Sequence, residues 1–76
     1  MSVTVYTSNT CPWCVKTKDY LASNGIAYNE INVSQDKAAA EAIVERTGQR
    51  GVPIIDIDGE IILGFDKEEI DRLLNL

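Results

Sequence analysis

The stretch Thr10-Cys11-Pro12-Trp13-Cys14 holds the only two cysteines of the chain, which are separated by two residues. A short β-branched and aromatic run, Val3 to Thr7, precedes it, and a segment compatible with a helix follows it. Two cysteines on one helical turn reach the Cα separation that a disulfide needs, and the same turn accommodates two free thiols. The pattern therefore predicts a dithiol/disulfide redox centre at the start of a helix.

The two cysteines are expected to differ in reactivity. Pro12 suits the first helical position, which places Cys11 at the helix N-terminus, where free N–H groups and the positive dipole end favour a thiolate. We hypothesise that Cys11 is the nucleophile and that Cys14, one turn further on, resolves the mixed disulfide. Two other interpretations stay open. A structural disulfide would close too small a loop to constrain the unfolded chain much, and half of a metal site would need ligands from a second chain or from external thiols.

Length and composition predict one small domain spanning residues 1–76, with 45% hydrophobic and 25% charged residues. The chain has neither a run of about 18 apolar residues nor a basic and apolar leader, so we expect no membrane span and no secretory signal. Two cysteines are too few for a secreted disulfide scaffold. The sequence thus predicts a cytoplasmic protein.

The charged residues exclude several classes of function. The net charge is −5, from 7 basic and 12 acidic residues, which argues against nucleic acid as a partner because phosphate binding needs clustered Lys and Arg. The chain has no histidine, which excludes Cys–His nucleophilic catalysis and His-ligated metal sites. We therefore predict no metal site.

Local signals divide the chain into seven elements. The predicted elements are a strand at 3–7, a helix at 12–24, a strand at 27–33, a helix from 34 to about 47, strands at 52–57 and 60–63, and a helix after 66. Gly25 is expected to end the first helix, Ser34 to cap the second, and Asp58-Gly59 to form a type I′ turn. The first three elements form a βαβ unit, which makes its two strands parallel. The order β-α-β-α-β-β-α predicts a four-stranded mixed sheet flanked by helices.

The last helix carries the clearest start signal. Asp66 is the expected N-cap, with Glu69 as its capping-box partner, while Phe65 and Ile70 can form a hydrophobic staple. On the first helix, Cys14, Thr17 and Leu21 share one face, which is expected to point inward.

Several motifs of the chain resemble those of a known protein family. Cys-x-x-Cys after the first strand of a βαβ unit is typical of thioredoxin-like folds. The motifs Cys11-Pro12-Trp13-Cys14, Gly51-Val52-Pro53 and Leu63-Gly64-Phe65-Asp66, in this order, make the chain similar to the glutaredoxins over nearly its whole length. The resemblance implies a thioredoxin-like fold and a thiol–disulfide oxidoreductase that reduces protein disulfides or glutathione mixed disulfides. It implies a monomer with no tightly bound cofactor.

The resemblance also implies substrate-binding residues around the cysteines. Pro12 and Trp13 would border the substrate groove, Val52 would offer its backbone N–H and C=O to a bound thiol peptide, and Pro53 would be cis and face the redox motif. Phe65 and Asp66 would lie in the loop that receives the γ-glutamyl end of glutathione. The ordinary alternatives are a Trp13 ring folded onto the surface and an edge-strand role for Pro53.

Two nearby lysines leave a further choice open. Lys16 and Lys18 either stabilise the thiolate or are solvated surface charges.

The resemblance leaves two candidates for the electron donor. Ser8 stands where glutaredoxins often place a lysine, Gly51 where a threonine is common, and Gly64-Phe65-Asp66-Lys67 replaces the usual Gly-Gly-x-Asp-Asp loop. Gln49 and Arg50 could still bind a glutathione carboxylate. The Gly-Phe pair resembles the glutaredoxin-like redoxins that thioredoxin reductase reduces. The resemblance therefore leaves glutathione and a flavoprotein reductase as donors.

Two other classes of function compete with an oxidoreductase. In one, two chains hold an iron–sulfur cluster through Cys11 and two glutathiones, which would give a coloured dimer. In the other, the chain is a structural adaptor with inert cysteines.

Overall fold

The computed structural model describes residues 2–49 and 51–76, and within them the elements follow the predicted order β-α-β-α-β-β-α. They are β1 (Val3–Thr7), α1 (Pro12–Ser23), β2 (Asn29–Asn32), α2 (Lys37–Thr47), β3 (Ile54–Ile57), β4 (Glu60–Leu63) and α3 (Lys67–Leu74). Of the helices in the described part of the chain, none has the length and apolar character needed to cross a membrane.

The four strands form one mixed sheet in the order β2-β1-β3-β4. β1 pairs in parallel with β2 and antiparallel with β3, and β3 pairs antiparallel with β4. The β3–β4 hairpin turns at Asp58 and Gly59, whose φ angles of 51° and 94° are both positive, as a type I′ turn requires. The predicted parallel βαβ unit and the tight hairpin are both confirmed.

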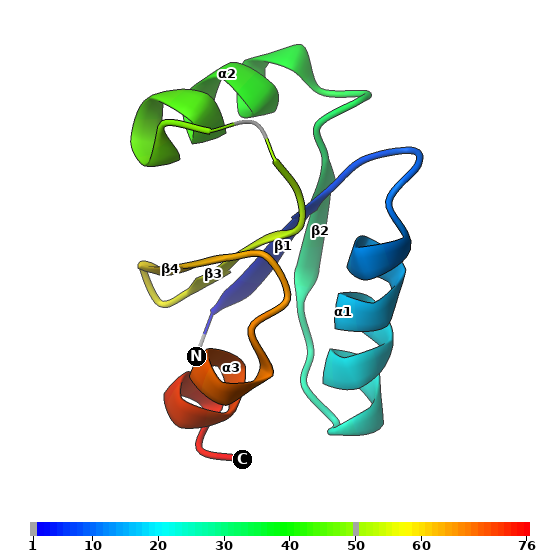
Figure 1. Ribbon diagram of the computed structural model, residues 1–76, viewed down its shortest axis with the longest axis vertical. Coiled ribbons are helices and arrows are strands. Elements are labelled where there is room, and N and C mark those ends of the chain that lie inside the picture. Colours follow the sequence, from blue (N-terminus) through cyan, green and yellow to red (C-terminus); the bar gives the residue numbers. More distant parts are fainter. Residues whose placement is uncertain (1, 50) are drawn as a thin grey trace.

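Helices cover both faces of the sheet, as Figure 1 shows with α1 and α3 on one side and α2 on the other. The face toward α1 and α3 carries the main hydrophobic core, which comprises Val3, Val5, Leu21, Ile55, Ile57, Ile62, Ile70 and Leu74. Successive strand residues point to opposite faces, so Asp56 faces α2. Its carboxylate pairs with Arg46 of α2 at 2.7 Å.

The predicted inward face of α1 is confirmed, since Cys14, Thr17 and Leu21 are all buried. The helix ends at Ser23 rather than at Asn24, which is the C-cap, and Gly25 follows with a φ of 70°. That left-handed conformation is the one expected of a glycine that closes a helix.

Other predicted boundaries were wrong. β2 spans Asn29–Asn32 and not 27–33, because as an edge strand it pairs only with four residues of β1. β3 begins at Ile54 instead of Val52. The reason is Pro53, which has no N–H to donate to a strand ladder.

The N-cap of α2 is Asp36, not Ser34 as predicted. The Asp36 carboxylate accepts the N–H of Ala39 at 3.0 Å. The Ser34 hydroxyl instead accepts the N–H of Asn9, in the loop before the cysteines, at 3.2 Å. Ser34 thus serves the redox loop rather than the helix.

The predicted N-cap of α3 is confirmed, since the Asp66 carboxylate accepts the N–H of Glu69 at 3.3 Å. The Glu69 carboxylate, however, pairs with Arg72 at 2.7 Å instead of completing the capping box. Phe65 packs against the core cluster that contains Ile70, as the staple requires.

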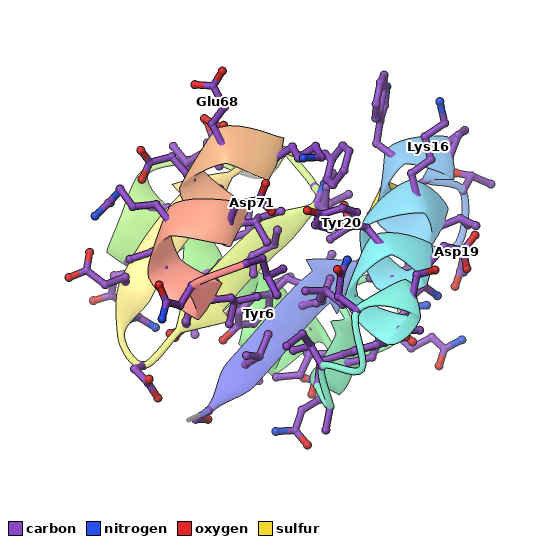
Figure 2. The ribbon with its side chains drawn as sticks, turned by 90° about the horizontal axis from the view of Figure 1, so that it is seen from below. Tyr6, Lys16, Asp19, Tyr20, Glu68 and Asp71 are labelled. Carbon is purple, nitrogen blue, oxygen red and sulfur yellow. A yellow bond between two sulfur atoms is a disulfide. The ribbon has the colours of Figure 1, made fainter. Side chains whose placement is uncertain are left out.

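A polar cluster joins α1 to α3. The Tyr20 hydroxyl donates to the carboxylate of Asp71, and Figure 2 shows these two side chains facing each other between the helices. Lys67 also pairs with Asp71, at 2.9 Å. The Tyr20 hydrogen bond, followed by that of Lys67, holds the pKa of Asp71 below its ordinary value, and the same contact raises the pKa of Tyr20. These contacts hold α3, and with it the preceding loop, against α1.

Candidate functional site

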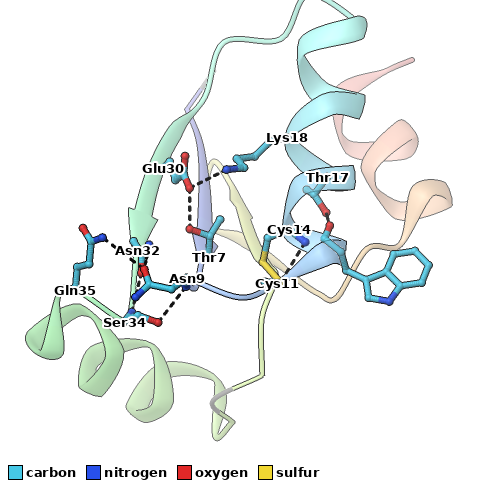
Figure 3. A network of polar contacts seen from close by, with 11 residues as sticks. Thr7, Asn9, Cys11, Cys14, Thr17, Lys18, Glu30, Asn32, Ser34 and Gln35 are labelled. Atoms are coloured by element: carbon cyan, nitrogen blue, oxygen red, sulfur yellow. Dashed lines mark hydrogen bonds and ion pairs between the residues drawn. A yellow bond between two sulfur atoms is a disulfide. The ribbon is translucent and has the colours of Figure 1, made fainter.

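Cys11 and Cys14 form a disulfide at the start of α1, with their Cα atoms 5.2 Å apart. Cys11 is the N-cap of the helix, and Pro12 occupies the first turn. The Cys14 N–H donates to the sulfur of Cys11 at 3.1 Å, a contact drawn in Figure 3. The expected placement of the pair on one helical turn is therefore confirmed, and a backbone donor points at the Cys11 sulfur.

The two sulfurs are not equally accessible. Cys14 is buried, with 2% of its surface exposed, on the face of α1 that packs against the sheet. Cys11 is partly exposed, and Pro12 beside it is exposed. An incoming disulfide can therefore reach Cys11 from outside, whereas Cys14 is positioned to bond to the Cys11 sulfur from within the fold.

Trp13, which lies between the two cysteines in the sequence, lines an open cavity of about 250 Å³, which we call the aromatic groove. Its lining residues come from three segments and are Trp13, Val52, Pro53, Gly64 and Phe65. The Val52–Pro53 peptide bond is cis, as predicted. The fold therefore brings together the two predicted substrate-binding segments and the residue between the cysteines.

Trp13 forms the outer wall of the groove. Its side chain is 55% exposed, and its ring centroid is 6.2 Å from that of Phe65. Phe65 in turn makes an edge contact with Tyr20, at 5.7 Å between centroids. Of the two interpretations of Trp13, the geometry favours a partly exposed ring beside a groove, supported from behind by Phe65.

The two lysines near the cysteines have different surroundings. Lys16 lies over the Trp13 ring, with its Nζ atom 4.5 Å from the ring centroid. Lys18 pairs with the carboxylate of Glu30 on β2 at 3.1 Å. Lys18 is therefore engaged with the sheet, whereas Lys16 contacts the Trp13 ring, which lines the groove.

Polar contacts that the sequence analysis missed lie behind and beside the cysteines (Figure 3). The buried hydroxyl of Thr7 donates to Glu30 at 2.8 Å, and this bond, with that of Lys18, lowers the pKa of Glu30. Asn32 donates to the side chain of Asn9 at 2.9 Å, which ties the loop before Cys11 to the end of β2. An asparagine in a loop is a sequence signal for a side-chain hydrogen bond. Its partner, Asn32, lies 23 residues away in the chain, so the sequence did not identify it.

The other predicted substrate-binding residues are placed as follows. Phe65 lines the groove, while the Asp66 carboxylate is directed to the first turn of α3 as its N-cap. The Pro53 carbonyl accepts the N–H of Gly64 at 2.8 Å, which joins two walls of the groove. Arg50 lies outside the described residues.

A larger cavity, of about 470 Å³, is lined by Glu30, Ile31, Asn32, Gln35 and Asp36. None of the predicted site residues contributes to it. Among residues 2–49 and 51–76, no three His, Cys, Asp or Glu side chains are grouped as metal ligands would be. The redox pair and the aromatic groove are therefore the candidate functional site.

Known proteins share this arrangement of sequence and fold. Residues 3–62 match the family model described as Glutaredoxin. An uncharacterized glutaredoxin-like 8.6 kDa protein from the rubredoxin operon of Clostridium pasteurianum is 47% identical over 72 residues, which cover 95% of this chain and 96% of the relative. Glutaredoxin 3 of Escherichia coli K12 is 37% identical over 65 residues, or 86% of this chain and 78% of the relative.

Among solved structures, the glutaredoxin-like NrdH-redoxin of Escherichia coli superposes with a TM-score of 0.86 and 34% identity, covering 96% of this chain and 95% of that one. The family match, the relatives similar over most of their length and the thioredoxin-like fold agree with the cysteine pair at the start of α1. The chain therefore belongs to the glutaredoxin family of thiol–disulfide redox proteins.

Proposed function

We propose that the chain reduces disulfides in proteins, or mixed disulfides with glutathione, through Cys11 as nucleophile and Cys14 as resolving thiol. The observation that carries this proposal is the unequal exposure of two sulfurs that can bond to each other at the start of a helix. A structural disulfide would not need one sulfur at the surface beside a groove. We further propose that the protein acts as a cytoplasmic monomer.

The reaction consists of two exchange steps. The Cys11 thiolate attacks one sulfur of the substrate disulfide, which forms a mixed disulfide and releases the other sulfur as a thiolate that takes up a proton. The Cys14 thiol then loses its proton and attacks the Cys11 sulfur, which releases the second substrate thiol and forms the Cys11–Cys14 disulfide. Two electrons pass to the substrate, and a donor must return two to the protein.

The groove residues bind the substrate segment in this proposal. The backbone of Val52 pairs with the substrate next to its reacting sulfur, and Pro53 holds that backbone beside the redox pair. Trp13 and Phe65 contact the neighbouring substrate side chain, while Pro12 leaves the approach to Cys11 open. Asp66 contributes by holding the start of α3, and so Phe65, in place.

For the donor, we propose a flavoprotein reductase such as thioredoxin reductase, with glutathione as the weaker reductant. Three departures from the usual glutathione-binding residues support this choice, namely Ser8, Gly51 and the Gly64–Phe65–Asp66 loop. The solved NrdH-redoxin is described by a thioredoxin-like activity profile, and its chain is similar to this one over nearly its whole length.

The test is to reduce the oxidised protein in parallel with glutathione plus glutathione reductase and with NADPH plus thioredoxin reductase. We expect the second route to be faster, and Cys11→Ser to abolish both. If glutathione reduces the protein as fast as it reduces a standard glutaredoxin, the donor assignment is wrong. If neither route reduces a disulfide substrate through this protein, the proposed function itself fails.

A charge reversion sharpens the donor test. Ser8→Lys should raise the rate with a glutathionylated substrate by up to about fivefold, because an exposed ion pair contributes about 0.2–1 kcal/mol. Ser23→Lys, which adds the same charge at the exposed end of α1, is the matched control and should change nothing. Equal effects of the two variants would attribute the gain to net charge and not to a carboxylate contact at Ser8.

A further inference from the structure

Lys16 is a cation that lies over Trp13, a wall residue of the aromatic groove, and no carboxylate among the described residues pairs with it. Among the residues that the structure describes, the ion pairs join Lys18 to Glu30, Arg46 to Asp56, Lys67 to Asp71 and Arg72 to Glu69. Lys16 is in none of them. Instead its Nζ atom lies 4.5 Å from the centroid of the Trp13 ring, which also forms the outer wall of the groove. The Trp13 ring thus contacts a positive charge and also lines an apolar cavity.

The size of the groove limits what can occupy it. Its volume is about 250 Å³, and its walls include the side chains of Trp13, Val52, Pro53 and Phe65. Sites for whole small ligands usually enclose about 300–1,000 Å³. A single large apolar side chain, presented by a longer segment, therefore suits this cavity better than a complete ligand does.

We propose that the groove and Lys16 together select a protein segment in which a large apolar residue is followed or preceded by an acidic one, close to the disulfide that Cys11 attacks. The apolar side chain fills the aromatic groove, and the carboxylate pairs with Lys16 beside Trp13. This inference rests on the proposed function and specifies the class of substrate.

Charge complementarity supports an acidic segment despite the net charge of −5. At physiological ionic strength charges are screened over about 8 Å, so the nearest cation outweighs the distant acidic surface. The nearby acids also limit where an acidic substrate residue can lie. Asp66, the N-cap of α3, and Glu68, in its first turn, follow Phe65 in the chain. Asp19 lies one turn along α1 from Lys16, as Figure 2 shows, and is in none of the ion pairs named above. An acidic substrate residue is therefore disfavoured beside the start of α3, and Lys16 is the cation placed to pair with it next to Trp13.

The chain has one tryptophan, Trp13, so its fluorescence reports docking directly and independently of any thiol chemistry. The binding experiment uses the oxidised protein and three peptides that carry a central Phe, serines in place of cysteines, and Glu, Gln or Lys beside the Phe. We expect the Glu peptide to bind about two- to fivefold tighter than the Gln peptide, as one exposed ion pair allows, and the Lys peptide to bind weakest. The difference should decrease at high salt.

Three variants separate the charge of Lys16 from its packing on Trp13. Lys16→Met keeps a long side chain over the ring and should abolish the preference for Glu, whereas Lys16→Arg should keep it. Lys37→Met removes a charge from the exposed start of α2 and is the matched control, which should behave as the unmodified protein does. If Lys37→Met weakens the preference as much as Lys16→Met does, net charge and not Lys16 sets it, and the inference is overturned.

The same three peptides, made with an intramolecular disulfide, test turnover. Glu-selective binding together with Glu-selective kcat/KM supports both the inference and the proposed function. Equal turnover of the three peptides overturns the inference and leaves the proposed function standing. Glu-selective binding without turnover of any peptide overturns the proposed function, while the selectivity of the groove and Lys16 stands. If Lys16→Met weakens glutathione binding but not peptide binding, the carboxylate partner of Lys16 is glutathione and the inference is wrong.

Discussion

The Cys14 N–H that donates to the Cys11 sulfur predicts how far the reactivity of Cys11 departs from that of a free cysteine. A hydrogen bond to a charged group stabilises it by about 1.5–3 kcal/mol, and each 1.36 kcal/mol in favour of the thiolate lowers its titration midpoint by one pH unit. Among the residues that the structure describes, the Cys14 N–H is the one such donor to the sulfur, at 3.1 Å, and Pro12 has no N–H to add a second. We therefore take the lower end, a midpoint about one pH unit below that of free cysteine.

The assay measures the rate of iodoacetamide alkylation against pH in the reduced Cys14→Ser protein. The same protein in denaturant provides the reference midpoint. Cys11→Ser is the matched control, in which the buried Cys14 should react more slowly and with a midpoint no lower than the denatured reference. A folded Cys11 midpoint equal to the denatured one, or faster reaction of Cys14, would refute the assignment of Cys11 as the activated nucleophile.

Three further predictions concern stability. Asp66→Ala removes the cap of α3 and should lower the free energy of unfolding, measured by urea titration, by about 0.5–2 kcal/mol. Glu68→Ala, at an exposed position in the first turn of the same helix, is the control and should lower it less. Ile70→Ala removes a fully buried core side chain and should cost about 2–5 kcal/mol in the same titration, and a wild-type midpoint would contradict its place in the core. The pKa of Asp71 is lowered from 3.8, so its carboxylate stabilises the fold above that pH and this contribution is lost as the pH falls through the lowered folded value. Acid unfolding of Asp71→Asn should therefore depend less on pH in that range, and profiles of identical shape would show that the Asp71 carboxylate does not contribute to acid stability.

Local physical chemistry made much of the fold predictable. Caps, glycines and the turn at Asp58 and Gly59 act over a few residues, so they are visible in the sequence and most were located correctly. The errors occurred where a distant partner intervened. Ser34 was expected to cap α2, but its hydroxyl is used by Asn9, 25 residues away in the chain. β2 is shorter than its pattern suggested because its length is set by pairing with β1.

The same division applies to the site. The sequence by itself determined the chemistry, because two cysteines one helical turn apart and a start-of-helix proline need no distant contact to define a redox pair. Only the tertiary structure decided the surroundings of that pair. Sheet pairing and the packing of α3 on α1 bring residues 13, 52–53 and 64–65 together in the groove. The position of Lys16 over Trp13 depends on how both side chains pack at the surface. Such contacts depend on the summed burial and pairing of the whole chain, which no local pattern specifies.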